Sequence, residues 1–161
     1  MVIVLMGVSG CGKTTVGRLL ASRLGWPFHD GDDYHPPSNV EKMSRREPLT
    51  DADRQPWLER LAGMIRDWVE QRHNAILACS ALSERSRQTL GVDQPQVRLV
   101  YLKGSYELIR QRLLERKEHF MPPDLLDSQF ATLQEPRDAI VVDIAPAAEQ
   151  IAATIEARLG R

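Results

Sequence analysis

The most constraining feature of the sequence is a glycine-rich segment close to its start. Residues 7–14 read Gly-Val-Ser-Gly-Cys-Gly-Lys-Thr and match the pattern G-x-x-x-x-G-K-[ST] at every fixed position. The apolar run 2–6 precedes this segment, and a helical pattern over residues 14–24 follows it. Strand, glycine-rich turn and helix in this order are the context in which the pattern binds phosphate, so the segment favours an α/β fold.

The chemistry of this segment predicts a nucleoside triphosphate site. Glycines let backbone N–H groups turn inward around phosphates, a lysine reaches the β- and γ-phosphates, and a threonine hydroxyl can hold Mg²⁺. The predicted nucleotide contacts are Gly7, Val8, Ser9, Gly10, Cys11, Gly12, Lys13, Thr14 and Thr15. We interpret Cys11 as a small residue that fills the loop. A glycine-rich turn without a ligand is the alternative.

The rest of the chain alternates short apolar runs with longer amphipathic ones, which indicates a parallel sheet flanked by helices. The strands predicted are residues 2–6, 27–29, 75–79, 97–102 and 139–143, and the helices are 14–24, 52–72, 83–90, 106–117 and 147–159. Residues 31–50 and 118–136 fit this alternation poorly, and we interpret them as ligand-covering segments. A chain of 161 residues without a linker favours one domain over residues 1–161.

Charge and cysteine content exclude several classes of partner. The formal net charge is −1, which gives no overall field to attract nucleic acid or an anionic membrane. Six apolar residues at the start are too few for a signal sequence or a membrane span. Two cysteines are too few for a disulfide framework. The sequence therefore predicts a cytoplasmic protein with no nucleic-acid or membrane partner.

Two carboxylates follow the second predicted strand. Asp30-Gly-Asp32 falls at the carboxyl edge of the sheet, where α/β proteins place their ligands. One carboxylate could support Mg²⁺, and the other could orient or deprotonate a hydroxyl group of an acceptor. A solvated acidic turn is the alternative. Nearby His35 and Lys42 could add contacts to the acceptor.

Arginines supply the remaining candidates for anion binding. Asp51 and Asp53 lie in the first turn of a predicted helix, where acidic residues suit the helix dipole, but Arg54 could bind either a ligand or a neighbouring acidic side chain. Arg112 and Arg116 lie four residues apart on one helical face, where like charges repel unless an anion lies between them. Such a pair suits phosphoryl transfer, and a solvated basic face is the alternative.

Several longer segments carry a family resemblance. The sequence resembles the small bacterial gluconokinases, which are P-loop kinases related to shikimate kinase and adenylate kinase. The resemblance covers nearly the whole chain, and it is carried by residues 5–13, 30–32, 35–36, 39, 41–43, 48–49, 51–58, 79–82, 101–104, 116–117, 119–120 and 128–136. The family usually has a lysine and a tyrosine where this chain has Ser83 and Ser86, so the contacts made by residues 83–87 are expected to differ.

The resemblance implies a three-layer P-loop kinase fold with a five-stranded parallel sheet. It also implies a substrate-covering region at about residues 34–50, a lid at about residues 117–126 and a homodimer. The implied reaction is the ATP- and Mg²⁺-dependent phosphorylation of D-gluconate to 6-phospho-D-gluconate. Two alternatives remain: a P-loop kinase for another small hydroxy acid such as shikimate, and a nucleotide-binding regulatory protein without acceptor turnover.

Individual roles follow from the resemblance as well. Lys13, Asp32 and Arg116 would be catalytic, with Asp32 touching the reacting hydroxyl and Arg116 directed at phosphate. Thr14 and Asp30 would hold the metal ion, and Arg112 would lie against adenine. The acceptor would contact Asp32, His35, Lys42, Arg54, Arg87, His119 and Gln129.

Overall fold

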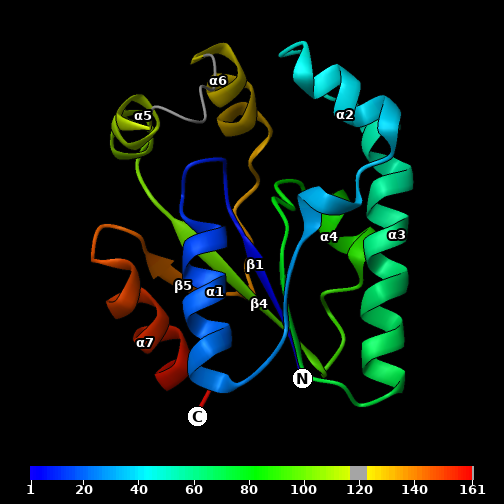
Figure 1. Cartoon of the computed structure of the whole chain (residues 1–161), viewed down its shortest axis with the longest axis vertical. Helices are drawn as coiled ribbons and strands as arrows, with labels where there is room; N and C mark the ends of the chain where they lie inside the picture. Colours follow the sequence, from blue (N-terminus) through cyan, green and yellow to red (C-terminus); the bar gives the residue numbers. More distant parts are fainter. Residues whose placement is uncertain (117–122, 161) are drawn as a thin grey trace.

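A parallel β-sheet organises the protein, as the computed structural model shows for residues 1–116 and 123–160 (Figure 1). Its five strands lie in the order β2-β3-β1-β4-β5, and every neighbouring pair is parallel. The strands are β1 (Val2–Met6), β2 (Phe28–Asp30), β3 (Ala75–Ala78), β4 (Val97–Lys103) and β5 (Ile140–Asp143). The predicted five-stranded parallel sheet is confirmed.

Strand β1 lies at the centre of the sheet, and its five residues are all buried. Successive side chains of a strand point to opposite faces. Ile3 and Leu5 accordingly join one hydrophobic cluster, whereas Val2, Val4 and Met6 join the other. An uninterrupted apolar run is what a strand covered on both faces requires.

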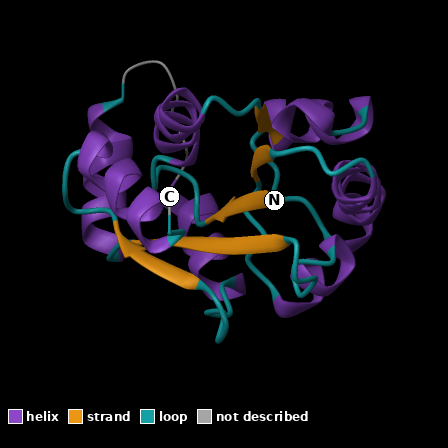
Figure 2. Cartoon of the chain, turned by 90° about the horizontal axis from the view of Figure 1, so that it is seen from below, coloured by secondary structure: helices purple, strands orange, loops and turns teal. Residues whose placement is uncertain are grey.

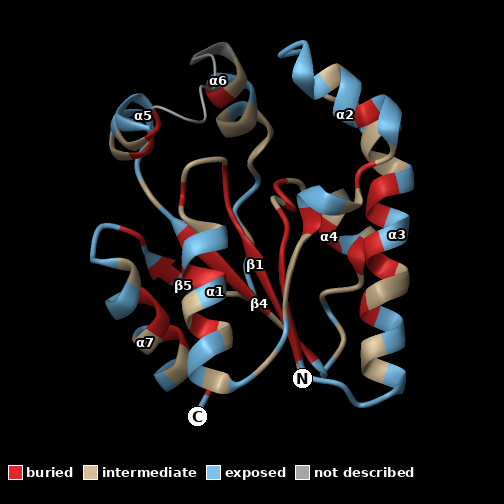
Figure 3. Cartoon of the chain, viewed as in Figure 1, coloured by how far each residue is buried: buried red, intermediate tan, exposed pale blue. Residues whose placement is uncertain are grey.

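Helices cover both faces of the sheet, which gives three layers (Figures 1 and 2). Helices α1 (Lys13–Leu24) and α7 (Ala148–Arg158) pack on one face, and α3 (Asp51–Glu70) and α4 (Glu84–Leu90) pack on the other. Their inward sides are buried, as Figure 3 shows. Strands β1, β2 and β3 are parallel, so their carboxyl ends lie at the same edge of the sheet. The glycine-rich segment follows β1 at this edge, and the acidic segment follows β2.

Four further elements lie beyond that edge. A 3₁₀ helix, η1 (Gly31–Tyr34), leads into α2 (Pro37–Ser44), and α5 (Tyr106–Glu115) and α6 (Pro123–Thr132) lie side by side above the glycine-rich loop (Figure 1). Residues 31–50 and 118–136, for which the sequence predicted no helix or strand, contain α2 and α6. Both helices bury few apolar side chains, so their sequences lack the periodicity that marks a core helix. Most of the lid predicted at about 117–126 lies outside the described residues.

In the part of the chain that the structure describes, no helix combines the length and the apolar character needed to cross a bilayer.

Candidate nucleotide and acceptor site

The glycine-rich loop joins β1 to α1, and its conformation depends on glycine. Gly10 has a φ of +84°, and a Cβ there would lie 2.8 Å from Cγ of Leu113 on α5. A side chain at this position would therefore meet both backbone strain and a packed neighbour. Gly12, with a φ of +94°, precedes the first residue of α1. The loop thus places the N-terminus of a helix, with its partial positive charge, at the expected phosphate site.

Lys13 reaches back across this loop. Its Nζ donates hydrogen bonds to the carbonyl oxygens of Gly7, at 2.7 Å, and Val8, at 3.1 Å. Cys11 lies beneath it, 1% exposed, with Sγ 3.8 Å from the same nitrogen. A bound phosphate would compete with the two carbonyls for the ammonium group. The burial of Cys11 agrees with its interpretation as a residue that fills the loop.

Thr14 and Asp30 meet across the site, as expected of two groups that share a metal ion. Thr14 Oγ1 donates to Asp30 Oδ2 at 3.2 Å, and Asp30 Oδ1 accepts from the backbone N–H of Asp32 at 3.0 Å. Mg²⁺ prefers oxygen ligands and usually keeps waters and substrate phosphates beside one or two protein groups. The hydroxyl and the carboxylate beside the loop therefore fit such an ion.

The turn that carries Asp32 is fixed from behind. The indole N–H of Trp57 on α3 donates to the carbonyl of Gly31 at 2.7 Å. A Cβ at Gly31 would lie 2.6 Å from the carbonyl oxygen of Ala78, so only glycine lets the turn pack this closely against β3. Asp32 is thereby held at the sheet edge with 78% of its side chain exposed.

Asp32 lies in a negative environment. Its pKa is raised, first because surrounding protein limits the hydration of its carboxylate and then because the carboxylate of Asp30 repels its charge. Lys13 opposes this shift, and Asp33 adds to it. A carboxylate that holds its proton more firmly is a better acceptor for the hydrogen of a hydroxyl group.

His35 belongs to a buried polar network between η1, α2 and α3. Its ring stacks on Trp57 with centroids 4.1 Å apart, and its Nδ1 lies 3.2 Å from Nδ2 of Asn39. Asn39 Nδ2 also donates to the carbonyl of Asp53 at 2.8 Å, so this nitrogen is a donor and His35 Nδ1 is an acceptor. The proton of neutral His35 therefore resides on Nε2, which lies 3.8 Å from Asp32 Oδ1.

Burial makes His35 a source of pH-dependent stability. Desolvation lowers its pKa to about 4 in the folded protein, below the unfolded value of about 6.5. Between these values the unfolded chain binds more protons, so stability falls as the pH drops from 6.5 towards 4. Urea unfolding at pH 7 and pH 4.5 should show that His35→Gln loses about 2 kcal/mol less than the wild type across this interval. His73→Gln, the same exchange at an exposed histidine, is the control and should lose as much stability as the wild type. Equal losses of stability in the wild type and His35→Gln would contradict the lowered pKa of His35.

Helix α3 begins with a capping box that confirms the structural role predicted for Asp53. The Thr50 side chain accepts from the Asp53 N–H while the Asp53 carboxylate accepts from the Thr50 N–H. Lys42 on α2 donates to Asp53 Oδ2 at 2.7 Å, and this bond, followed by those from Thr50, lowers the Asp53 pKa to about 2. Arg54 binds Asp51 at 2.6 Å, which is the neighbour-pairing alternative, and the Leu49 carbonyl at 2.7 Å. Acceptor contacts by Lys42 and Arg54 stay predictions.

Arg87 is 7% exposed, and its guanidinium is engaged by the backbone. It donates to the carbonyl oxygens of Ala81 at 2.8 Å, Leu82 at 3.1 Å and Gln134 at 2.7 Å. These bonds join the loop after β3 to the segment after α6. The two serines that depart from the family pattern lie at the start of α4, where Ser83 is the N-cap and its Oγ accepts from the Ser86 N–H at 3.1 Å. The acceptor contact predicted for Arg87 stays a prediction.

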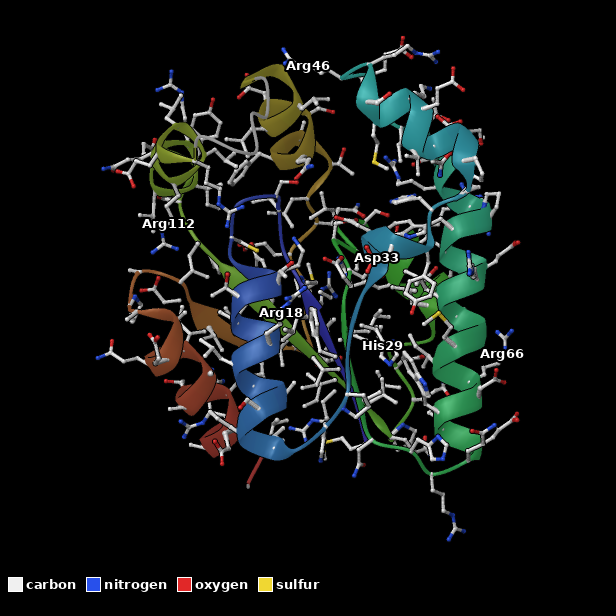
Figure 4. The ribbon with its side chains drawn as sticks, in the orientation of Figure 1. Arg18, His29, Asp33, Arg46, Arg66 and Arg112 are labelled. Carbon is white, nitrogen blue, oxygen red and sulfur yellow. The ribbon has the colours of Figure 1, made fainter. Side chains whose placement is uncertain are left out.

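A cavity of about 350 Å³ adjoins the loop on the side of α5. Its walls include Gly12, Thr15, Arg112, Arg116 and Pro146. Arg112 extends from α5 towards the segment between β5 and α7, where Nη2 donates to the Ile144 carbonyl at 2.7 Å (Figure 4). This position beside the predicted phosphate site suits a purine base. The two arginines predicted to share a helical face therefore line one cavity.

Gln129 on α6 lies against the loop itself. Its side chain forms two hydrogen bonds with Ser9, a contact between residues 120 positions apart that no local sequence pattern predicts. Among the predicted site residues, the structure brings Thr14 and Asp30 together in one contact and Ser9 and Gln129 in another. His119 lies outside the described residues.

Comparison with known proteins agrees with this geometry. A protein-family model described as shikimate kinase matches residues 9–157. Together with the phosphate loop and the parallel sheet, this match defines a P-loop kinase of the shikimate kinase class.

Similar proteins of known name identify the family within that class. The gluconokinase of Gluconobacter oxydans (strain 621H) is 51% identical over 136 residues, which cover 84% of this chain and 76% of the relative. The thermoresistant gluconokinase of Escherichia coli (strain K12) is 44% identical over 162 residues, with 96% and 91% covered. The crystal structure of a gluconokinase from Sinorhizobium meliloti 1021 superposes with a TM-score of 0.86 at 40% identity, covering 98% of this chain and 91% of that one. The chain belongs to the gluconokinase family.

Proposed function

We propose that this protein transfers the γ-phosphoryl group of ATP to the terminal hydroxyl of D-gluconate and releases ADP and 6-phospho-D-gluconate. The observation that carries the proposal is the meeting of the phosphate loop with the Asp30 and Asp32 turn, in a chain of the gluconokinase family. The loop supplies a place for the nucleotide, and the turn supplies a carboxylate for the acceptor hydroxyl.

The protein's part in this reaction is positioning and charge stabilisation. Lys13 would leave the carbonyls of Gly7 and Val8 to bind the phosphates. Asp32 would accept the hydroxyl proton while the acceptor oxygen bonds to phosphorus and the bond to the departing ADP oxygen breaks. Arg116 would neutralise charge on the transferring group. Thr14 and Asp30 would hold Mg²⁺, which when bound neutralises phosphate charge.

The acceptor side is proposed to lie between the Asp32 turn and the region of residues 34–50. Lys42 and Arg54 stand in this region as ion-paired cations, with 26% of each side chain exposed. A sugar-acid carboxylate could take over the place of Asp53 or Asp51 beside one of them. The buried ring of His35 closes the region behind Asp32. We further propose that the protein is cytoplasmic, a proposal supported by its buried free cysteines Cys11 and Cys79. The family resemblance supports the proposal that it forms a homodimer.

Acceptor-dependent ADP release tests the proposal directly. We expect turnover with ATP, Mg²⁺ and D-gluconate, and a ³¹P NMR signal of a phosphate monoester on the terminal carbon. Shikimate and other hydroxy acids, assayed in parallel, should support far slower turnover. If gluconate supports no turnover and another hydroxy acid supports rapid turnover, that acid is the acceptor and the gluconate proposal is wrong. If the protein binds nucleotide but no acceptor supports turnover, the regulatory alternative holds.

A further inference from the structure

Ser9 and Gln129 lie 120 residues apart in the sequence and form a two-point contact. The backbone N–H of Ser9 donates to Gln129 Oε1 at 2.7 Å, and Gln129 Nε2 donates to Ser9 Oγ at 3.0 Å. Both bonds are partly buried. The contact links the tip of the phosphate loop to helix α6.

Helix α6 is fixed in place around this contact. Leu126, one helical turn before Gln129, is 1% exposed and belongs to the same hydrophobic cluster as β1 and α1. Phe130 packs edge-on against Tyr106 of α5, with ring centroids 5.4 Å apart. Residues three and four apart share a helical face, so Leu126 anchors the side of α6 from which Gln129 reaches the loop.

The neighbouring loop residue contacts the other flanking helix. Gly10 lies directly against Leu113 of α5, where even one added carbon would clash. Ser9 and Gly10 are therefore held by α6 and α5 respectively, and the loop tip is sensitive to the positions of both helices.

The carboxamide of Gln129 has bonding capacity left over. A primary amide offers two N–H donors and two acceptor lone pairs, and Ser9 uses one of each. Within the described residues one donor and one acceptor site of this carboxamide remain, the combination that pairs with the hydroxyl groups of a polyhydroxy acid. One side chain can therefore bind Ser9 and an acceptor at the same time.

We propose that Gln129 is a positioning residue that couples acceptor binding to nucleotide binding through Ser9. This inference rests on the proposed function, because it needs a hydroxylated acceptor beside Gln129. An acceptor that binds the remaining donor and acceptor of the Gln129 carboxamide fixes the orientation of that carboxamide. The two bonds to Ser9 then hold the loop in the conformation that binds phosphates. Nucleotide then binds a loop already ordered, so each ligand tightens the other by the same factor.

The size of this coupling follows from the two bonds. A hydrogen bond of this kind typically changes an affinity by a factor of about 2 to 10. We therefore expect gluconate to tighten the binding of a non-hydrolysable ATP analogue by about five-fold in the wild type.

Titration calorimetry with this analogue, with and without saturating gluconate, tests the coupling. Gln129→Leu keeps the approximate size of the side chain and removes both bonds, so the five-fold tightening should disappear. Gln129→Glu should retain it, because the carboxylate still accepts from the Ser9 N–H and the Ser9 hydroxyl can turn to donate. Gln111→Leu, the same exchange at an exposed position of α5, is the matched control and should tighten like the wild type.

Turnover of gluconate by the wild type, measured on the same samples, separates the two proposals. If the wild type turns over gluconate and gluconate still tightens binding of the ATP analogue five-fold in Gln129→Leu, the coupling is overturned and the proposed function stands. A raised KM for gluconate in Gln129→Leu would then show that Gln129 is an ordinary acceptor contact. Absence of wild-type turnover and of tightening overturns both. If Gln129→Leu fails to fold, Ser9→Ala removes one of the two bonds from the loop side and should reduce the tightening by itself.

Discussion

Lys13→Ala is expected to lower kcat/KM for ATP by at least about 10³-fold. Removing one preorganised donor at a developing negative charge costs about 10²- to 10³-fold, and Lys13 carries a full charge placed to meet two phosphates. Steady-state ADP release at saturating gluconate measures the loss. Calorimetry with the ATP analogue should show weakened binding in the same variant.

The fold should survive this change, since the hydrogen bonds that the ammonium group makes among the described residues go to the carbonyls of Gly7 and Val8 and the sulfur of Cys11. Equal midpoints of thermal unfolding would establish this. Lys103→Ala, which removes an exposed ion pair with Glu135, is the matched control and should keep full activity. Activity of Lys13→Ala within ten-fold of the wild type would exclude the loop as the phosphate site.

Asp32→Asn is expected to lower kcat by about 10²- to 10⁴-fold, the range for loss of a positioned general base. The amide has nearly the same shape as the carboxylate, but it cannot take a proton from the acceptor hydroxyl. Nucleotide affinity should hold or rise slightly, because the change removes a negative charge from beside Asp30 and the phosphate site. A single-turnover assay with saturating ATP and gluconate isolates the chemical step.

Asp33→Asn is the control for this prediction. Asp33 follows Asp32 in the chain and is exposed on η1 (Figure 4), so its loss changes the local charge by the same amount without removing the proposed base. It should keep turnover within about three-fold, as usual for an exposed charge. Similar losses in both variants would show that overall charge matters and that Asp32 has no particular role.

The sequence was sufficient to predict the central sheet and the phosphate loop because both follow local rules. The run 2–6 is apolar throughout and is buried on both faces, and the glycines of the loop stand where the backbone takes a positive φ. Local chemistry also predicted the acidic first turn of α3, because Asp53 bonds to Thr50, only three residues away. Features determined within a few residues of the chain can be predicted from that part of the chain.

Helix α2 escaped prediction because its stability has another source. Its apolar residues Val40 and Met43 are 51% and 38% exposed, so no periodic apolar face marks it. It is held by polar contacts to α3, namely Asn39 to the Asp53 carbonyl and Lys42 to the Asp53 carboxylate. Such contacts depend on the folded arrangement of two distant segments.

The partners of Arg87 also depend on the folded arrangement of distant segments. The family resemblance implies an acceptor contact for Arg87, which stays a prediction, and in the structure the Arg87 guanidinium donates to the carbonyls of Ala81, Leu82 and Gln134. Ala81 has a φ of +45°, and its carbonyl would lack this donor without Arg87. Which partner a buried cation takes is determined by the chain geometry around it, which no local pattern records.

The central position of β1 has a consequence for synthesis of the chain. Val2 pairs with Ala75 on one side and Val97 on the other, so β1 is synthesised before both of its neighbours and waits for them. At about 5 to 20 residues per second, that delay lasts several seconds or more. Throughout this time five adjacent apolar residues lack the sheet that will cover them. The segment that anchors the phosphate loop in the mature protein is thus the one most in need of protection from aggregation while the protein is being made.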